Sequence, residues 1–283
     1  MREAAAPERL RAALDDLVAE ACGAGGELAL DIRHLERGER YQRGTDVLFS
    51  AASTIKLPIL VALYGEAAHG RIRLDEPVRL RAEDQVTGSG VLQLLSPGIR
   101  LPWRDVAELM IAVSDNAATN LILARLGLER VNACLQSLGL RRTVVGGPLQ
   151  VIPAEPGPCS NAVTAGDLAA LLEHVARGTA ISWEACRRMV ATLKRQQFNE
   201  ALPALLPPPL PHGAPLGACP AWELAHKTGG IIGHEHDAGI LYLPGQSIVI
   251  CALSRHGGDA RWARGLLARV GRAVWGWYAA PLS

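Results

Sequence analysis

Ser53 and Lys56 lie three residues apart at the head of an apolar run that continues through Leu63. In a helix, residues at this spacing share a face, and each side chain leans back toward the preceding turn. We therefore expect the Lys56 amine to point at the Ser53 hydroxyl, close to the positive end of the helix dipole. A partly desolvated lysine can lose its proton near neutral pH. The pair can thus provide a nucleophilic serine without a histidine.

Lysine usage draws attention to the same position. Only three of the 29 Lys+Arg residues are lysine, namely Lys56, Lys194 and Lys227. Arginine stays protonated in proteins, whereas lysine can give up its proton. We infer that this chain keeps lysine where arginine will not serve. The alternative interpretation of Ser53 taken alone is a helix N-cap serine followed by a solvated lysine.

Two further polar motifs accompany this pair along the chain. The three motifs are, in order, Ser53-x-x-Lys56, Ser114-Asp115-Asn116 and Lys227-Thr228-Gly229. Ser-x-x-Lys, Ser-Asp-Asn and Lys-Thr-Gly form the signature of class A β-lactamases and penicillin-binding proteins. The chain resembles that serine hydrolase superfamily over most of its length. The resemblance implies an α+β sandwich in which a five-stranded antiparallel sheet, flanked by N- and C-terminal helices, carries an inserted helical subdomain.

The resemblance also implies a role for each motif. Ser53 is expected to attack a strained lactam or an ester carbonyl, with Lys56 as its base or proton relay. Ser114 is expected to pass a proton to the leaving nitrogen, and Asp115 to cap the following helix. The residues expected to bind substrate are Lys227, which also assists proton transfer, Asn116, Thr228, Gly229 and Gly230. The implied oxyanion hole consists of the backbone N–H groups of Ser53 and Gly230.

One family motif is absent. Class A β-lactamases carry Glu-x-x-Leu-Asn between the second and third motifs, and its glutamate activates the water that removes the acyl group. Residues 146–161 lack this pattern, and Glu155, followed by Pro156, is their only carboxylate. We consider two alternatives: either Glu155 acts as the base from a shortened loop, or it is a solvated residue and deacylation is slow.

Histidines offer a further candidate position. The family holds the substrate carboxylate with a basic residue on the strand after Lys-Thr-Gly, where this chain has His234 and His236. Their spacing places both on one strand face, as in a metal-binding pair. No third ligand and no HExxH pattern accompany them, so we expect neither a metal nor another cofactor. No Gly-x-Ser-x-Gly elbow supports a Ser-His-Asp triad.

Hydrophobic periodicity predicts the elements that hold these residues. A helix with Leu10, Leu14 and Leu17 precedes strands around residues 28–32 and 41–48. A largely helical region follows to about residue 197, then a proline-rich surface connection at 204–220. Strands are expected at 222–228, 238–243 and 247–253. A last helix should turn inward the following residues: Trp262, Leu266, Val270, Ala273 and Trp277. This order predicts one antiparallel sheet completed by both ends of the chain.

Length and composition limit the other possibilities. The 283 residues, 49% hydrophobic and 20% charged, suit one domain. We divide it into a sheet subdomain, 1–70 plus 215–283, and a helical insert, 71–214. A net charge of +1 gives no reason for a nucleic-acid or anionic-membrane partner, and no run could span a bilayer. We expect a monomer acting on a small molecule, either a β-lactam or a cell-wall-like peptide or ester.

Cysteines and the N-terminal residues bear on localisation. The six cysteines are scattered without a C-x-x-C pair, and residues 1–18 show no secretory signal. We expect a cytoplasmic protein, or a periplasmic or secreted one if a leader has been removed.

The sequence thus predicts a serine hydrolase of the class A β-lactamase family that is acylated at Ser53 and hydrolyses the acyl group. Two alternatives stay open. One is a penicillin-binding, peptidase-like or esterase-like protein with weak or no lactam turnover. The other is a non-catalytic ligand-binding sensor, which would not need to keep nucleophile and bases together.

Overall fold

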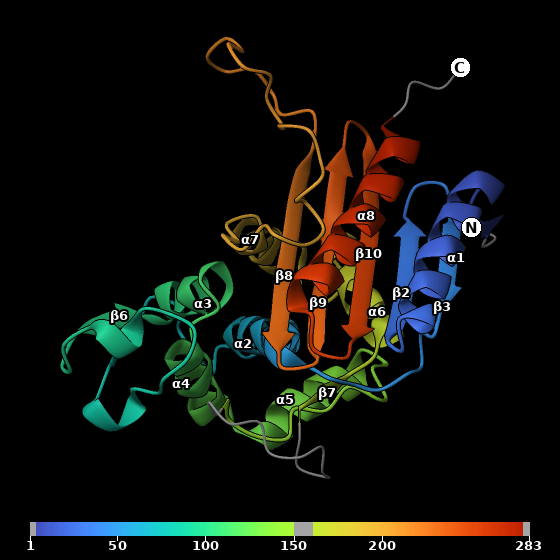
Figure 1. Cartoon of the computed structure of the whole chain (residues 1–283). Coiled ribbons are helices and arrows are strands. Elements are labelled where there is room, and N and C mark those ends of the chain that lie inside the picture. The colour runs from blue at the N-terminus through green and yellow to red at the C-terminus, as the bar shows by residue number, and fades with distance from the viewer. Residues whose placement is uncertain (1–3, 150–160, 280–283) are drawn as a thin grey trace.

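The computed structural model describes residues 4–149 and 161–279, and a six-stranded sheet forms its centre (Figure 1). The strand order is β1-β3-β2-β10-β9-β8. The strands are β1 (Ala4–Ala5), β2 (Glu27–His34), β3 (Glu39–Arg43), β8 (Glu223–Ile231), β9 (His234–Leu243) and β10 (Gln246–Arg255). β1 runs parallel to β3, and every other neighbouring pair is antiparallel.

The α+β class predicted from the sequence is confirmed, with one addition to the sheet. The five longer strands form the expected antiparallel sheet, built from both ends of the chain. β1 is a sixth strand of two exposed alanines at one edge. A two-residue segment without alternating apolar residues gives no strand signal in the sequence. β8 forms the opposite edge, and its outer side faces the helical part of the molecule.

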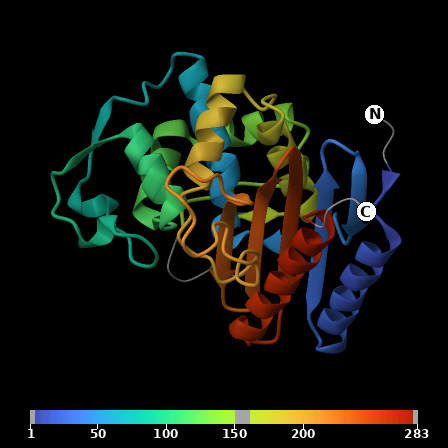
Figure 2. The same cartoon turned by 90° about the horizontal axis from the view of Figure 1, so that it is seen from above.

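Two helices cover one face of the sheet. α1 (Glu8–Gly23) and α8 (Ala260–Tyr278) lie along this face, away from the remaining helices (Figure 2). Leu14, Ile32, Leu266 and Val270 belong to the apolar core between helices and sheet. The other α8 residues predicted to face inward, Trp262, Ala273 and Trp277, are half-buried beside that core.

The helical part covers the other face. Its helices are α2 (Lys56–Ala68), α3 (Trp103–Ala112), α4 (Asn116–Leu126), α5 (Leu128–Ser137), α6 (Ala165–Ala176) and α7 (Trp183–Leu193). The short elements are η1 (Ala52–Ile55), η2 (Ala82–Asp84), η3 (Leu92–Leu94), β4 (Phe49–Ser50), β5 (Pro77–Arg79), β6 (Arg100–Pro102) and β7 (Ala162–Val163). One apolar core runs from the inner sheet face, at Ala225 and Val249, into these helices. The division into a sheet subdomain, 1–70 plus 215–283, and a helical insert, 71–214, stays a proposal.

Side-chain caps fix where several of these helices begin. Asp115 caps α4, Thr164 caps α6 and Ser182 caps α7, each through a backbone N–H three residues on. Such caps satisfy donors that have no partner within the helix. The caps fix the residue at which each of these helices begins. Inside the helical part, α2 is buried from Lys56 to Glu66.

Two remaining features concern the surface. The proline-rich connection at 204–220 extends past the end of β8, in agreement with its prediction as a surface segment (Figure 1). Among the described residues, no helix has the length and apolar character that crossing a membrane requires.

Candidate active site

Ser53 lies in η1, the 3₁₀ turn that leads directly into α2, and Lys56 is the first residue of α2. The Lys56 amine lies 3.1 Å from the Ser53 hydroxyl oxygen. The junction differs from a single helix that starts at Ser53, because the tighter turn precedes the α-helical part. The spacing of three residues brings the side chains together in either helix type.

Lys56 also meets the second motif. Its Nζ lies 2.6 Å from the Ser114 carbonyl oxygen, 2.9 Å from Ser114 Oγ and 3.0 Å from Asn116 Oδ1. The carbonyl and amide oxygens can only accept, so they take the two N–H groups of a neutral amine. The lone pair then faces two hydroxyls, those of Ser53 and Ser114. This arrangement can move a proton between the two serines through one nitrogen.

Burial determines the charge state of Lys56. The side chain is buried, and loss of hydration lowers the pKa of its amine well below the ordinary value. The charge of Lys227 lowers that pKa further, while the Asp115 carboxylate opposes the change. Lys56 can therefore be a neutral base in the resting site.

The backbone around both serines adopts an unusual conformation. Among the described non-glycine residues, positive φ occurs at Ala52, with 44°, and at Ser114, with 54°. Side chains disfavour this left-handed region, so each residue is held there by its surroundings at an energy of about 1–3 kcal/mol. One of the two directly precedes Ser53, and the other carries the Ser114 hydroxyl itself. The strain therefore lies directly before the candidate nucleophile and at the candidate proton relay.

Asp115 joins α4 to the loop that covers it. One carboxylate oxygen accepts from the Ala118 N–H at 2.9 Å, and the other accepts from Val91 and Leu92 N–H at 2.6 and 2.8 Å. A side chain at Gly90, which has φ of 109°, would clash with both the backbone and the carboxylate of Asp115. The expected capping role therefore extends to holding this loop beside Asn116.

The third motif lies on β8, against η1. Lys227 is fully buried, and its amine donates to the Thr228 carbonyl at 2.8 Å. Burial lowers the pKa of Lys227 to about 7, while the Asp237 carboxylate acts in the opposite direction. A Cβ on Gly229 would lie 3.0 Å from the Ser53 nitrogen and 2.9 Å from the Thr54 nitrogen. Only glycine lets the strand approach Ser53 so closely.

These residues border a cleft of about 600 Å³ that opens at the edge of the sheet. Ser53, Ser114, Thr228 and Gly230 line it, together with residues from the start of α8 and from 198–201. All eight residues that we selected from the sequence therefore lie at this cleft or in direct contact with a residue that lines it.

A model of the beta-lactamase enzyme family matches residues 9–278, which is most of the chain. The chain belongs to the beta-lactamase enzyme family. It is 28% identical over 239 residues to a beta-lactamase of Bacillus licheniformis, covering 81% of this chain and 72% of that protein.

Solved structures of family members resemble the fold closely. A beta-lactamase from Sphaerobacter thermophilus is similar with a TM-score of 0.86 and 30% identity, over 93% of this chain and 96% of that one. The penicillin-binding protein PBP-A is similar with a TM-score of 0.84 and 31% identity, over 98% of each chain. The chain is thus a serine beta-lactamase-like hydrolase whose structural relatives include both a beta-lactamase and a penicillin-binding protein.

The histidines of β9 correct one family-based expectation. His236 is buried, its Nε2 faces the Ser50 carbonyl at 2.8 Å, and its Nδ1 accepts from Ser254 N–H at 3.2 Å. Burial lowers its pKa to about 4, so it is neutral at pH 7 and cannot supply positive charge for a substrate carboxylate. The i, i+2 spacing does bring His234 close, with ring centroids 5.8 Å apart. The described part of the chain contains no group of three potential metal ligands.

Two carboxylates on the cleft wall were missed by sequence reasoning. Glu235 of β9 and Glu200 both line the cleft, with Arg264 of α8 nearby. Neither glutamate lies in a recognisable motif. Only the pairing of Gly230 with Glu235 reveals that Glu235 is next to the strand that carries Lys-Thr-Gly. Glu155, the candidate deacylation base, lies outside the described residues, so its role stays a prediction.

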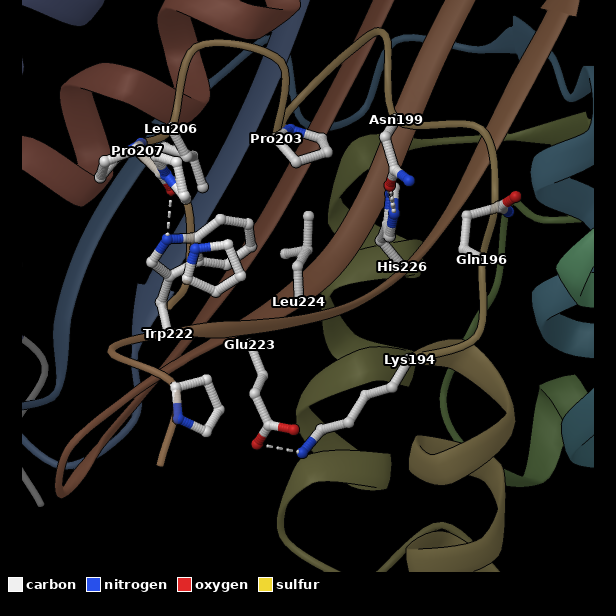
Figure 3. A pocket seen from close by; sticks show the side chains of 13 residues that line it. Lys194, Gln196, Asn199, Pro203, Leu206, Pro207, Trp222, Glu223, Leu224 and His226 are labelled. Carbon is white, nitrogen blue, oxygen red and sulfur yellow. Dashed lines mark hydrogen bonds and ion pairs between the residues drawn. The ribbon is translucent and has the colours of Figure 1, made fainter. Parts of the chain in front are cut away.

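A second cavity of about 580 Å³ lies against the first residues of β8, between the proline-rich connection and the end of α7 (Figure 3). Trp222 Nε1 donates to the Pro207 carbonyl at 2.8 Å, and Lys194 pairs with Glu223 at 2.6 Å across its rim. His226 closes one end, with Nδ1 2.9 Å from Asp237 Oδ1. Lys194, the third lysine, thus forms a surface ion pair and takes no part in the Ser53 cleft.

Proposed function

We propose that this protein is a class A-type serine hydrolase in which Ser53 attacks the carbonyl of a β-lactam, or of a related amide or ester, and the acyl-enzyme is then hydrolysed. The observation that carries the proposal is the buried Lys56 amine, placed 3.1 Å from Ser53 Oγ and 2.9 Å from Ser114 Oγ. A neutral amine between two hydroxyls is one arrangement that supports acyl transfer without histidine.

The proton follows a short route in this proposal. As Ser53 Oγ bonds to the carbonyl carbon, its proton moves to the lone pair of Lys56. Lys56 then protonates Ser114, whose own proton goes to the leaving nitrogen or oxygen as the acyl bond breaks. Lys56 returns to the neutral state, and the acyl group stays on Ser53. The N–H groups of Ser53 and Gly230 are proposed to stabilise the oxyanion.

The remaining motif residues are proposed to hold the substrate. Protonated Lys227 provides positive potential for an anionic group and for proton transfer at Ser114. Thr228 donates a hydrogen bond, and Asn116 orients Lys56 through Oδ1. The Asn116 amide nitrogen donates to the Thr87 carbonyl at 3.5 Å and has a second N–H for the substrate. Gly229 and Gly230 leave the edge of β8 open to an extended substrate.

Release of the acyl group separates the two leading candidates. Residues 146–161 lack Glu-x-x-Leu-Asn, which favours a long-lived acyl-enzyme, as in a penicillin-binding protein. A point mutant of PBP-A has been solved as an acyl-enzyme complex with penicillin G, and that chain is 30% identical to this one. In the first candidate Glu155 activates water, and in the second no efficient base does so. Esterase or peptidase activity would use the same Ser53 chemistry.

One experiment distinguishes these candidates. Purified protein is mixed with a chromogenic cephalosporin, and both product formation and intact protein mass are followed over time. Steady hydrolysis that disappears in Ser53→Ala supports the lactamase, whereas a stable mass adduct on Ser53 without turnover supports the long-lived acyl-enzyme. Unchanged turnover in Glu155→Gln would exclude that residue as the deacylation base.

The same mixture can contradict the proposal. If neither an adduct nor hydrolysis appears with any lactam or activated ester, Ser53 is not a nucleophile and the sensor alternative gains support. Thr54→Ser is a matched control, because it keeps a hydroxyl in the neighbouring η1 position and leaves Ser53 in place. This variant should react as the wild-type protein does.

A further inference from the structure

Glu235 lies where a substrate would pass along β8. In the register of β8 and β9, Glu235 is directly opposite Gly230, so both residues lie on the same face of the sheet. A Cβ added to Gly230 would stand 3.0 and 3.2 Å from the two carboxylate oxygens of Glu235. The missing side chain of Gly230 therefore leaves this carboxylate open to the cleft.

The Glu235 carboxylate is not saturated by protein donors. Its side chain is 15% exposed, and its ion pair is a long one, 3.8 Å to Arg264 Nε. Arg264 Nε itself is directed to the Ala260 carbonyl at 3.3 Å. Among the described residues, none donates a hydrogen bond to the Glu235 carboxylate. A half-buried acceptor without a donor is a position where a ligand donor is favoured.

The charges on the cleft wall favour the same kind of ligand. Glu200 and Glu235 both line the cleft, against the single guanidinium of Arg264. The lining histidines, His236 and His256, have pKa values lowered by burial and add no charge at pH 7. Burial raises the pKa of Glu235, Glu200 raises it further, and Arg264 opposes both. The residues that line the cleft are therefore net negative when Glu235 is ionised, and the buried Lys227 behind Thr228 is the opposing charge.

We propose that Glu235 is a specificity-determining residue that selects acyl donors with a protonated amine on the leaving-group side and disfavours donors with a carboxylate there. This inference rests on the proposed function, because the leaving group must lie along Thr228 and Gly230 for its charge to meet Glu235. An ammonium group would donate to the free carboxylate oxygens. A carboxylate, as in a cephalosporin, would be attracted by Lys227 but repelled by Glu235. The substrate class is an amine-bearing amide or ester, such as a peptide with a basic residue after the cleaved bond.

The test uses three aryl esters with one common acyl group. Their phenol leaving groups carry an aminomethyl, a carboxamide or a carboxylate substituent, and acylation of Ser53 is followed by phenol release and intact mass. The intact protein and Glu235→Gln are compared by the ratio of the aminomethyl to the carboxylate rate. Differences in intrinsic leaving-group reactivity cancel between the two proteins. We expect the ratio to fall by about tenfold in Glu235→Gln, and acylation by the carboxylate ester to become faster.

Controls separate charge from folding. Glu129→Gln removes an exposed carboxylate at the start of α5 and should leave the ratio unchanged. Glu235→Asp keeps the charge on a shorter side chain and should restore part of the preference. In the wild-type protein, added salt should bring the aminomethyl and carboxylate rates closer together, because screening weakens attraction and repulsion alike.

The outcomes are distinct. A ratio that is equal in wild-type protein and Glu235→Gln, or a wild-type preference for the carboxylate ester, overturns the role of Glu235 while Ser53 acylation persists. Absence of Ser53 acylation by all three esters and by the cephalosporin overturns the proposed function itself, and the inference with it.

Discussion

Lys56 and Lys227 are both buried, and burial lowers the pKa of both amines. They differ in the charge that surrounds them. Lys56 lies among neutral oxygens and within reach of the Lys227 charge, whereas the Asp237 carboxylate supports the ammonium form of Lys227. In our proposal, this difference makes Lys56 the proton acceptor and Lys227 the positive charge. Lys227 carries its positive charge below its pKa of about 7.

Asp237→Asn tests this assignment at the residue scale. In our proposal, acylation by a carboxylate-bearing lactam falls as pH rises through about 7, because Lys227 then loses its charge. Removal of the Asp237 charge lowers the pKa of Lys227 further, so the midpoint of this decline should move down by about 1 in pH. The measurement is the pH profile of the acylation rate constant. Asp105→Asn, a surface change on α3, should leave the profile in place, and an unmoved midpoint in Asp237→Asn would show that the decline has another origin.

The elements around Ser114 work as one unit. α3 ends before Ser114, the left-handed turn at Ser114 redirects the chain, and Asp115 starts α4. The same Asp115 carboxylate holds the loop at Val91 and Leu92, and the Asn116 N–H donates to the Ser89 carbonyl at 3.0 Å. The start of α4, the loop at Val91 and Leu92 and the proposed proton relay at Ser114 thus depend on one buried side chain, Asp115.

Asp115→Ala should accordingly affect both stability and reactivity. Loss of the cap and of two loop hydrogen bonds should reduce the free energy of unfolding by about 3 kcal/mol, measured by urea denaturation. Acylation should slow as well, because Ser114 and Asn116 lose their fixed positions. Ser182→Ala removes the comparable cap of α7, a single bond of 3.2 Å, and should lower stability by about 1 kcal/mol without slowing acylation. Equal effects of both variants on acylation would contradict the proposal that Asp115 positions Ser114 and Asn116.

Sequence reasoning reached some of these features and missed others. The spacing of Ser53 and Lys56, and the cap at Asp115, were readable because they depend on neighbours three residues away. The burial of His236 was not readable, since it depends on Ser50 and Ser254 from other elements. Glu235 was missed for the same reason: its position follows from strand pairing. The positive φ of Ser114 was not expected because non-glycine residues rarely adopt it.

At the scale of the whole molecule, the site lies where the two layers meet. The β8 edge, the η1 turn and the α3–α4 junction approach each other there, and the large core continues beneath them. Lys227 is enclosed at this junction, so its protonation is linked to folding. In the unfolded chain its pKa is near 10.5, whereas in the native protein it is about 7. Between these pH values the unfolded chain binds the extra proton, and the contribution of Lys227 to stability therefore rises with pH.

Lys227→Met should make this contribution visible. Methionine fills similar space without a charge to desolvate, so the native state should gain about 2 kcal/mol at pH 7, after the loss of the hydrogen bond to the Thr228 carbonyl. The gain should shrink as pH rises from 7 toward 10.5, because lysine becomes neutral in the unfolded chain as well only above that pH. Thermal or urea unfolding across pH measures it. A loss of stability at pH 7 would mean that the Lys227 amine is better solvated or paired than its enclosure indicates.

The left-handed backbone at Ala52 and Ser114 has a consequence for how this chain can change over generations. Glycine adopts such angles freely, so Ala52→Gly or Ser114→Gly would relax the fold at positions where the chain now resists its own preferred geometry. If acyl transfer were no longer selected, we would expect such exchanges to be tolerated, because glycine at either position would favour folding. The left-handed residues of this chain, placed beside two enclosed lysines, are therefore what we expect where acyl transfer rather than ease of folding determines the residue.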